Sequence, residues 1–239
     1  MKLFIKEKRP IKLIALLLSS LLIINFNFGC TPNETETKKE NVVKEDKINI
    51  GMAFDSFVIE RWQRDRDVFV STAKEMGAEV NVQNANGNIE EQKKQIQYFI
   101  DCDVDVIVII CIDADSLSEE VQKARNAGIK VIAYDRIIRN SNIDLYISFD
   151  NKTVGKQMGD ALIESGIKEG DDVIMIGGSP VDYNVPALEE GFMEVMEENN
   201  ITISDITHCD AWRAELATDY MYENADKVAE AEAIMCGND

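Results

Sequence analysis

From Lys47 onward, short β-branched runs alternate with longer segments of helical spacing. Residues 104–112 are almost entirely apolar, which is typical of a strand buried on both faces of a sheet. Residues 61–76 show the other type, with apolar side chains every three to four positions. The apolar residues on one side of that helix are Val68, Phe69, Ala73 and Met76. Strands that alternate with helices predict βαβ units, so the expected fold class is α/β, with parallel sheets flanked by helices.

The alternation falls into two blocks. In the first block we predict strands at residues 48–54, 79–83, 104–112, 130–134 and 145–149, with helices at 61–76, 89–100 and 117–127. In the second block we predict helices at residues 154–167, 187–198 and 215–229, with strands at 172–177, 201–209 and 231–236. Nothing follows the last predicted strand to cover it, and a parallel sheet needs helices on both faces. We therefore expect the sheet of the second block to be incomplete.

The first 46 residues have the composition of a targeting segment and a tether. Basic residues within positions 2–12 precede an uncharged stretch, residues 13–29, which is the layout of a secretory signal peptide. The stretch ends in Gly29-Cys30, which resembles the lipobox of bacterial lipoproteins, where the cysteine is lipidated; Asn27 departs from that pattern. We assign residues 1–30 to a lipoprotein signal peptide ending at Cys30, with an uncleaved membrane anchor as the alternative. Residues 31–46 are too polar to fold alone and are expected to tether the protein to the outer face of the cell membrane.

Charge and cysteine usage argue against several function classes. The net charge of −19 repels phosphate backbones, so nucleic acid is not an expected partner. One histidine, His208, and five cysteines without Cys-x-x-Cys spacing provide no zinc motif and no Ser-His-Asp arrangement. We expect no metal, no cofactor and no catalytic residue. Cys102, Cys111 and Cys236 lie in or beside apolar runs and are expected to be core thiols, with a disulfide as the alternative.

Polar residues follow every predicted strand of the first block. In open parallel sheets, ligands bind beyond the carboxyl ends of the strands, so these residues are candidates for a site. They are Asp55-Ser56, Asn84–Asn88, Asp113–Ser116, Asp135-Arg136 and Asp150-Asn151. Residues 178–184 and 210–213 occupy the corresponding positions in the second block.

Six segments in a fixed order carry a resemblance to a known family. They are Ile50–Ala53, Glu60–Asp67, Ala85–Asn88, Ala133–Arg136, Tyr146–Asn151 and Gly177–Asp182. Together they resemble the xylose-binding members of the ribose/galactose-type periplasmic sugar-binding family, over residues 47–239. The resemblance implies a two-lobed periplasmic binding protein fold of type 1, in which the lobes close over a sugar. Residues 47–150 would form the N-terminal sugar-binding lobe and residues 151–239 a partial C-terminal lobe, because further family ligands would lie beyond Asp239.

The resemblance also implies which residues contact the sugar. A cleft for a neutral pentose needs bidentate hydrogen-bonding groups and flat aromatic surfaces. The implied sugar-binding residues are Arg61, Asp135, Arg136, Asp182, Asn184, Trp212 and Asn238, with the adjacent Asp239 as an additional candidate. Trp62 is a further candidate because it lies in a polar loop after a strand and offers a flat indole face. Simpler interpretations stay open: Asp135-Arg136 as a local salt bridge, Trp62 as packing beneath the first helix, residues 177–180 as a plain turn, and residues 65–67 as a solvated helix face.

The expected function is that of a receptor without catalytic activity. It would capture D-xylose or a related monosaccharide outside the cell and deliver it to the permease of an ABC importer. The alternative is a sugar-sensing lipoprotein that partners a membrane histidine kinase, and the neighbouring genes would distinguish the two. A glycoside hydrolase with a carboxylate pair ranks below both and is tested with aryl glycosides. A transcriptional repressor of related fold is contradicted by the signal peptide and by the missing DNA-binding segment.

Overall fold

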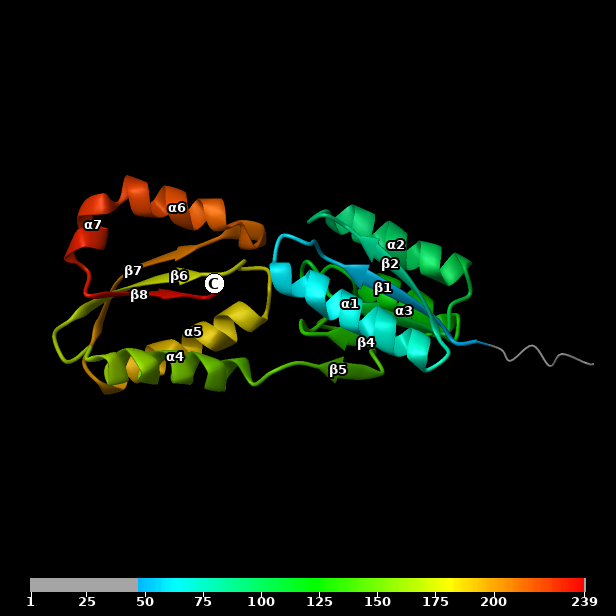
Figure 1. The fold of residues 1–239 in the computed structure, drawn as a ribbon, viewed down its shortest axis with the longest axis horizontal. Coiled ribbons are helices and arrows are strands. Elements are labelled where there is room, and N and C mark those ends of the chain that lie inside the picture. Colours follow the sequence, from blue (N-terminus) through cyan, green and yellow to red (C-terminus); the bar gives the residue numbers. More distant parts are fainter. Residues whose placement is uncertain (1–46, 239) are drawn as a thin grey trace, which may run out of the picture. The chain divides into compact units, whose positions relative to one another are not determined.

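The computed structural model describes residues 47–238, which form two α/β lobes in succession along the chain (Figure 1). The expected signal peptide and tether, residues 1–46, lie outside the described residues, as does Asp239. The chain leaves the first lobe after strand β5 (Leu145–Ile147) and enters the second at helix α4 (Asn151–Ser165). Within residues 47–238, every helix is too short or too polar to cross a bilayer.

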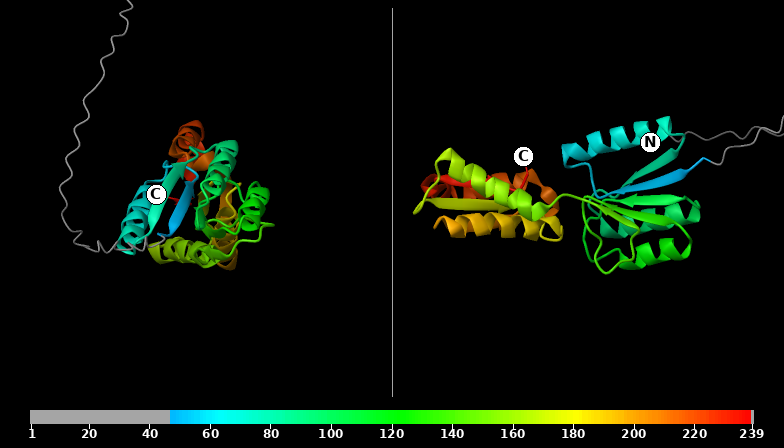
Figure 2. Two further views of the ribbon diagram at one scale, coloured as in Figure 1. Left: turned by 90° about the vertical axis from the view of Figure 1, so that its right-hand side faces the viewer. Right: turned by 90° about the horizontal axis from the view of Figure 1, so that it is seen from below.

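The first lobe is a five-stranded parallel sheet with the strand order β2-β1-β3-β4-β5. The four strands besides β5 are β1 (Asn49–Phe54), β2 (Glu79–Asn84), β3 (Val106–Ile109) and β4 (Lys130–Tyr134). Helices α2 (Ile89–Asp101) and α3 (Ser118–Asn126) lie on one face, and α1 (Glu60–Glu75) lies on the other (Figure 2). Because all the strands are parallel, their carboxyl ends meet at one edge of the sheet.

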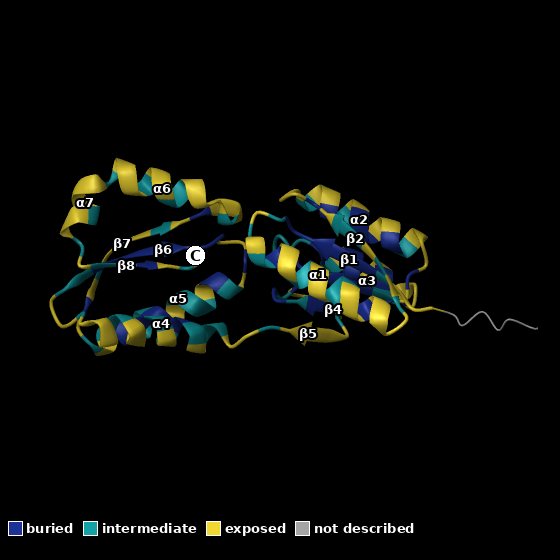
Figure 3. Ribbon diagram, in the orientation of Figure 1, coloured by how far each residue is buried: buried dark blue, intermediate teal, exposed yellow. Residues whose placement is uncertain are grey.

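The two faces of this sheet are buried to different degrees. On the face of α2 and α3, the core contains fully buried side chains such as Phe99, Ile107 and Val121. On the face of α1, Met52, Phe54 and Trp62 are buried, whereas Val68 and Met76 are exposed. Figure 3 shows α1 as a helix with both buried and exposed stretches. The apolar side that helical spacing predicts for this helix is therefore only partly buried. Among the described residues, α1 is the only helix on that face, and its flank remains uncovered.

The second lobe has, in the described residues, a three-stranded parallel sheet in the order β7-β6-β8. Its strands are β6 (Asp172–Gly177), β7 (Thr202–His208) and β8 (Ala233–Cys236). Helices α4 and α5 (Asn184–Glu198) cover one face, and α6 (Ala214–Glu223) and α7 (Ala225–Glu230) cover the other (Figure 1). The single helix predicted at residues 215–229 is broken at Asn224, whose ψ of 33° is not helical.

Helices α4 and α5 pack closely because a glycine on each helix faces the backbone of the other helix. A Cβ atom on Gly155 would lie 1.9 Å from the carbonyl oxygen of Leu188, and one on Gly191 would lie 2.0 Å from that of Lys152. Any larger residue at either position would push the two helices apart. Since α5 begins at Asn184, this packing also fixes the position of a predicted site residue.

None of the four cysteines in the described residues forms a disulfide. Cys111 is buried in the core, as predicted, and burial raises the pKa of its thiol to about 12. Cys102 and Cys236 are exposed, so their assignment as core thiols is wrong. Both lie at the ends of elements, Cys102 directly after α2 and Cys236 as the last residue of β8, where the apolar runs leave the core.

Candidate functional site

Both lobes contribute to a cavity of about 340 Å³ beyond the carboxyl ends of the strands. All of the sugar-binding residues predicted at described positions line it. From the first lobe these are Arg61, Trp62, Asp135 and Arg136, and from the second lobe Asp182, Asn184, Trp212 and Asn238. The remaining lining is mostly apolar, from Ile59, Phe149, Val154, Val185 and Leu188. Asn151 and Gly237 complete it.

A sharp turn after β4 presents Asp135 and Arg136 to this cavity. Asp135 has a φ of 67°, a left-handed conformation that is uncommon for a residue with a side chain. The turn is held by β5 and the residue after it: Asp135 N–H donates to the Ile147 carbonyl at 2.7 Å, and Ser148 Oγ donates to the Asp135 carbonyl at 2.6 Å. Backbone strain of this kind persists only where the surroundings hold it, and it is concentrated at functional sites.

Arg136 is buried between two carboxylates, one from each lobe. Its Nη1 donates to Asp55 Oδ2 at 2.7 Å and to the Cys111 carbonyl at 3.1 Å. Its Nε lies 2.6 Å from Asp182 Oδ2, which makes an ion pair, although the N–H bond is not aligned for a hydrogen bond. A buried charge is tolerated only when it is paired in this way. Asp55 and Asp182 thus hold Arg136 from opposite lobes, and the predicted local pair Asp135-Arg136 does not form.

Burial shifts the pKa values of this triad. Loss of solvent raises the pKa of Asp55 and of Asp182 above the ordinary value of 3.8, while the charge of Arg136 opposes the shift. Burial acts to lower the pKa of Arg136, but the carboxylates of Asp182 and Asp55 more than compensate and raise it. The guanidinium therefore stays charged, and the two carboxylates take up protons more readily than exposed ones.

Asp135 forms a second link between the lobes. Its carboxylate pairs with Arg61 Nη2 and accepts a hydrogen bond of 3.1 Å from Asn184 Nδ2. Arg61 Nε also donates to Asp65 Oδ2 at 3.3 Å, and the Tyr134 hydroxyl donates to the same oxygen at 3.0 Å. Asp65 therefore supports Arg61, in addition to its place on a mostly solvated helix face.

The two tryptophans reach the cavity in different ways. Trp62 is 2% exposed and belongs to the core beneath α1, yet it also lines the cavity, with the Arg61 guanidinium 4.3 Å from its ring centroid. Its indole N–H has no hydrogen-bond partner within residues 47–238. Trp62 therefore packs in the core beneath α1 and lines the cavity at the same time.

Trp212 is positioned by the loops of the second lobe. It ends the short 3-10 helix η1 (Asp210–Trp212), and its Nε1 donates to Asp182 Oδ2 at 3.1 Å. A Cβ atom on Gly178 would lie 2.2 Å from the indole ring, so only glycine leaves room for it. Strand β6 ends at Gly177, and the turn that follows is closed by Asp182 N–H, which donates to the Ser179 carbonyl at 3.0 Å. This turn carries Asp182, and Gly178 before it leaves room for Trp212.

Asp55, Phe149 and Asn151 were not in the predicted sugar-binding set, although Asp55 and Asn151 were among the strand-end candidates. Asp55 is buried and follows β1 directly, so its place at a strand end was the signal for it. Phe149 and Asn151 line the cavity from the segment that joins the lobes, and Arg61 lies 5.7 Å from the Phe149 ring centroid. Within the described residues, no cluster of three or more His, Cys, Asp or Glu side chains is arranged to hold a metal ion.

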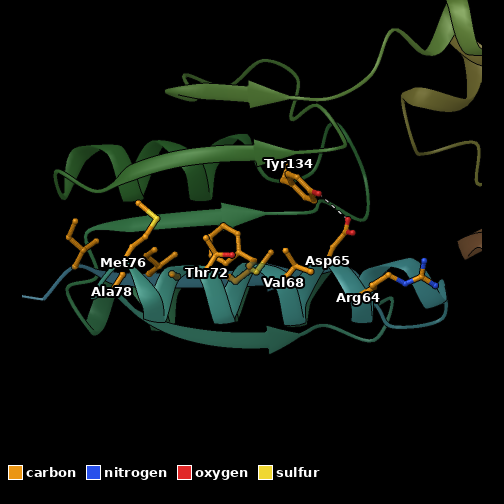
Figure 4. A pocket seen from close by; sticks show the side chains of 12 residues that line it. Arg64, Asp65, Val68, Thr72, Met76, Ala78 and Tyr134 are labelled. Atoms are coloured by element: carbon orange, nitrogen blue, oxygen red, sulfur yellow. Dashed lines mark hydrogen bonds between the residues drawn. The ribbon is translucent and has the colours of Figure 1, made fainter.

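Two other cavities are larger. One, of about 390 Å³, lies against Arg136 and Trp212 from another side and is lined by both lobes. The other, of about 590 Å³, is an apolar groove along the flank of α1, lined by residues such as Val68, Phe69 and Met76 (Figure 4). Arg64 and Asp65 are its only charged lining, and Asp65 is engaged by Tyr134 (Figure 4). The groove therefore has volume but few groups that could orient a polar ligand.

Comparisons with curated proteins give relatives that bind sugars. The chain is 42% identical over 183 residues to the D-xylose-binding periplasmic protein of Escherichia coli, covering 75% of this chain and 54% of that protein. It is 38% identical over 198 residues to the D-xylose-binding periplasmic protein of Haemophilus influenzae, covering 80% of this chain and 59% of that protein. The chain thus spans somewhat more than half the length of these curated relatives.

A solved structure agrees with the fold. An ABC transporter solute-binding protein from Clostridium phytofermentans with bound β-D-glucose superposes with a TM-score of 0.72 and 27% identity, covering 80% of this chain and 65% of that one. The fold is therefore that of a type 1 periplasmic binding protein. Residues 50–239 match the sequence model of the periplasmic binding protein domain, and the chain belongs to that family.

Proposed function

We propose that this chain is an extracytoplasmic receptor that binds D-xylose, or a closely related monosaccharide, in the cavity between its lobes. The observation that carries the proposal is the convergence of two arginines, two aspartates, three asparagines and two tryptophans on one cavity. They come from separate strand ends in both lobes, which is where ligands of parallel α/β folds bind.

The chemistry of the cavity suits a neutral sugar. Sugar hydroxyls both donate and accept hydrogen bonds, and the carboxylates of Asp135 and Asp182 and the forks of Arg61 and Arg136 provide strong partners of both kinds. The sugar C–H groups need a flat apolar surface, which the Trp62 and Trp212 rings offer. The positive and negative groups pair with one another, so the cavity has no excess charge that would favour an ionic ligand.

Two observations support a monosaccharide, and xylose first. The cavity volume of about 340 Å³ is at the lower end of the range for small-molecule sites. The two relatives described above are named for D-xylose. In this proposal the chain has no catalytic role, and the residues around the cavity bind and orient the sugar.

A thermal-shift screen of the purified chain against a panel of sugars tests the proposal. A ligand that binds only the folded chain stabilises it by RT ln(1 + [L]/Kd), which is about 2.7 kcal/mol at a concentration of 100 Kd. We expect D-xylose to raise the midpoint of unfolding more than hexoses or disaccharides do. A panel in which no monosaccharide shifts the midpoint at millimolar concentration would contradict sugar binding.

We further propose that the receptor is held at the outer face of the cell membrane by lipid on Cys30 and delivers its sugar to an ABC importer. The support is the Gly29-Cys30 motif after an uncharged stretch. Mass spectrometry of the membrane-extracted protein should show a mature chain that starts at a diacylated Cys30. An intact N-terminus, or an unmodified Cys30, would contradict the anchor and leave the sugar site unaffected.

A further inference from the structure

Outside the sugar cavity, the two lobes also meet at a small group of residues, of which Ala114 is buried and Arg139, Val181 and Tyr183 are exposed. Ala114 N–H, in the loop after β3, donates to the Val181 carbonyl of the second lobe at 3.2 Å. The guanidinium of Arg139, in the first lobe, lies 5.1 Å from the ring centroid of Tyr183 in the second. None of these four residues lines the sugar cavity.

The first-lobe half of this group is built to be rigid. Arg139 makes a bidentate pair with Asp115, with both N···O distances at 2.8 Å. The backbone N–H of Arg139 also donates to the Ala114 carbonyl at 2.7 Å. This bond ties the loop that carries Ala114 to the segment that carries Arg139. The preceding residue, Ile138, is buried in the core. Arg139 therefore presents a fixed cation to Tyr183 and loses little conformational entropy in doing so.

Each half lies next to residues of the sugar cavity. Arg139 comes three positions after Arg136, on the same segment. Tyr183 stands between Asp182 and Asn184, both of which line the cavity, while the Tyr183 ring is half-exposed at the surface. When the lobes separate, the contacts at Arg139 and those at Arg136 must break in the same motion, because both span the same two segments.

We propose that Ala114, Arg139, Val181 and Tyr183 form an interlobe latch that stabilises the closed arrangement without touching the sugar. The latch slows the departure of bound sugar by the same factor for every sugar. A contact present only in the closed arrangement shifts the closing equilibrium by its own free energy, whatever ligand is enclosed. Arg139 and Tyr183 are thus positioning residues that act on affinity through lobe closure.

The ligand-dependent test measures dissociation rates by stopped flow, and it rests on the proposed sugar binding. Arg139→Ala and Tyr183→Leu should each speed the dissociation of bound xylose by about two- to fivefold, the range for a partly exposed cation–π contact. The double variant should be no faster than the faster single variant, because both substitutions remove one contact. Tyr183→Phe, which keeps the ring, should match the original chain. The ranking of sugars should not change in any variant.

Arg125→Ala is the matched control, because Arg125 pairs with Asp144 within the first lobe only. It should leave the dissociation rate unchanged. Unchanged rates in Arg139→Ala and Tyr183→Leu, or a change in sugar ranking, would overturn the latch.

A second measurement needs no sugar, so failure of the latch can be told apart from failure of the proposed function. Hydrogen–deuterium exchange reports on the Ala114 amide, which Val181 protects across the lobes. In the full chain without sugar, exchange in the peptide around residues 112–116 should be faster in Arg139→Ala and Tyr183→Leu than in Arg125→Ala. Exchange within β3 should stay the same. Equal exchange at residues 112–116 in all three variants would contradict the latch, even if the chain bound no sugar.

Discussion

The cavity between the lobes and the groove beside α1 differ in size, lining and place on the sheet. The groove is larger, at about 590 Å³ against about 340 Å³, but its lining is almost wholly apolar. The cavity lies beyond the strand ends, where Asp135, Arg136 and Asp182 converge, whereas the groove runs along the uncovered flank of α1. The larger volume of the groove reflects apolar surface that no described element covers. The side chains that could bind a polar ligand lie instead in the smaller cavity at the strand ends.

The largest difference should come from removing Arg136. In Arg136→Ala, two sugar oxygens lose a charged partner, which costs about 2–3 kcal/mol and weakens binding by about 30- to 150-fold. Calorimetric titration measures this, and circular dichroism checks that the variant folds despite its two unpaired carboxylates. Affinity within twofold of the original would remove Arg136 from the site. Arg125→Ala, which loses an ion pair inside the first lobe, serves again as the control.

Lowering the pH should weaken sugar binding before the chain unfolds. The pKa values of Asp55 and Asp182 are raised by burial, so both carboxylates gain protons above pH 3.8, the pKa of an ordinary Asp. Protonation removes the charges that hold Arg136, and affinity should fall by up to about tenfold per pH unit below the raised pKa.

The effect of the same two groups on stability has the opposite sign. The folded chain binds these protons more tightly than the unfolded chain, so their contribution to stability is greatest at low pH and is lost as the pH rises through the raised pKa. Titrations and thermal melts across the same pH series measure both quantities. An affinity that stays constant down to the pH at which the chain unfolds would contradict this assignment.

A smaller effect is expected from Gly178→Ala, which fills the space where Trp212 rests. The new Cβ atom would lie 2.2 Å from the indole ring, so the ring must move. We expect sugar affinity to fall by about three- to tenfold, the value of one aromatic contact. The chain has only two tryptophans, so fluorescence of Gly178→Ala in a Trp62→Phe background reports on Trp212 alone. Unchanged emission and affinity would show that Trp212 does not depend on this glycine.

The smallest effect should come from the groove. Val68 is exposed and lines the groove, so Val68→Lys should change unfolding free energy by no more than about 0.5 kcal/mol. Sugar affinity should stay within about twofold, because the substitution lies outside the strand-end cavity. Loss of sugar binding in this variant would break the distinction between the two regions.

The sequence predicted the strand-end cavity better than it predicted the groove beside α1. The strand-end rule, together with the family resemblance, named residues on five separate segments, and the structure brings all the described ones to one cavity. Asp55 was named only as a strand-end candidate, because its role is to hold Arg136, a contact between residues 81 positions apart that no local pattern encodes. The exposure of Val68 and Met76 was missed for a similar reason. Helical spacing predicts which side is apolar, but tertiary packing decides whether another element covers it.

Calorimetric titration of the chain with D-xylose, D-ribose, L-arabinose and D-glucose, in parallel with Arg136→Ala and Val68→Lys, tests the assignment of the interlobe cavity most directly. We expect saturable binding of xylose by the original chain and by Val68→Lys, weaker binding of the other sugars, and binding of xylose weakened by about 30- to 150-fold in Arg136→Ala. Binding of all four sugars that is indifferent to Arg136→Ala, or no saturable heat with any of them, would contradict the cavity as the sugar site.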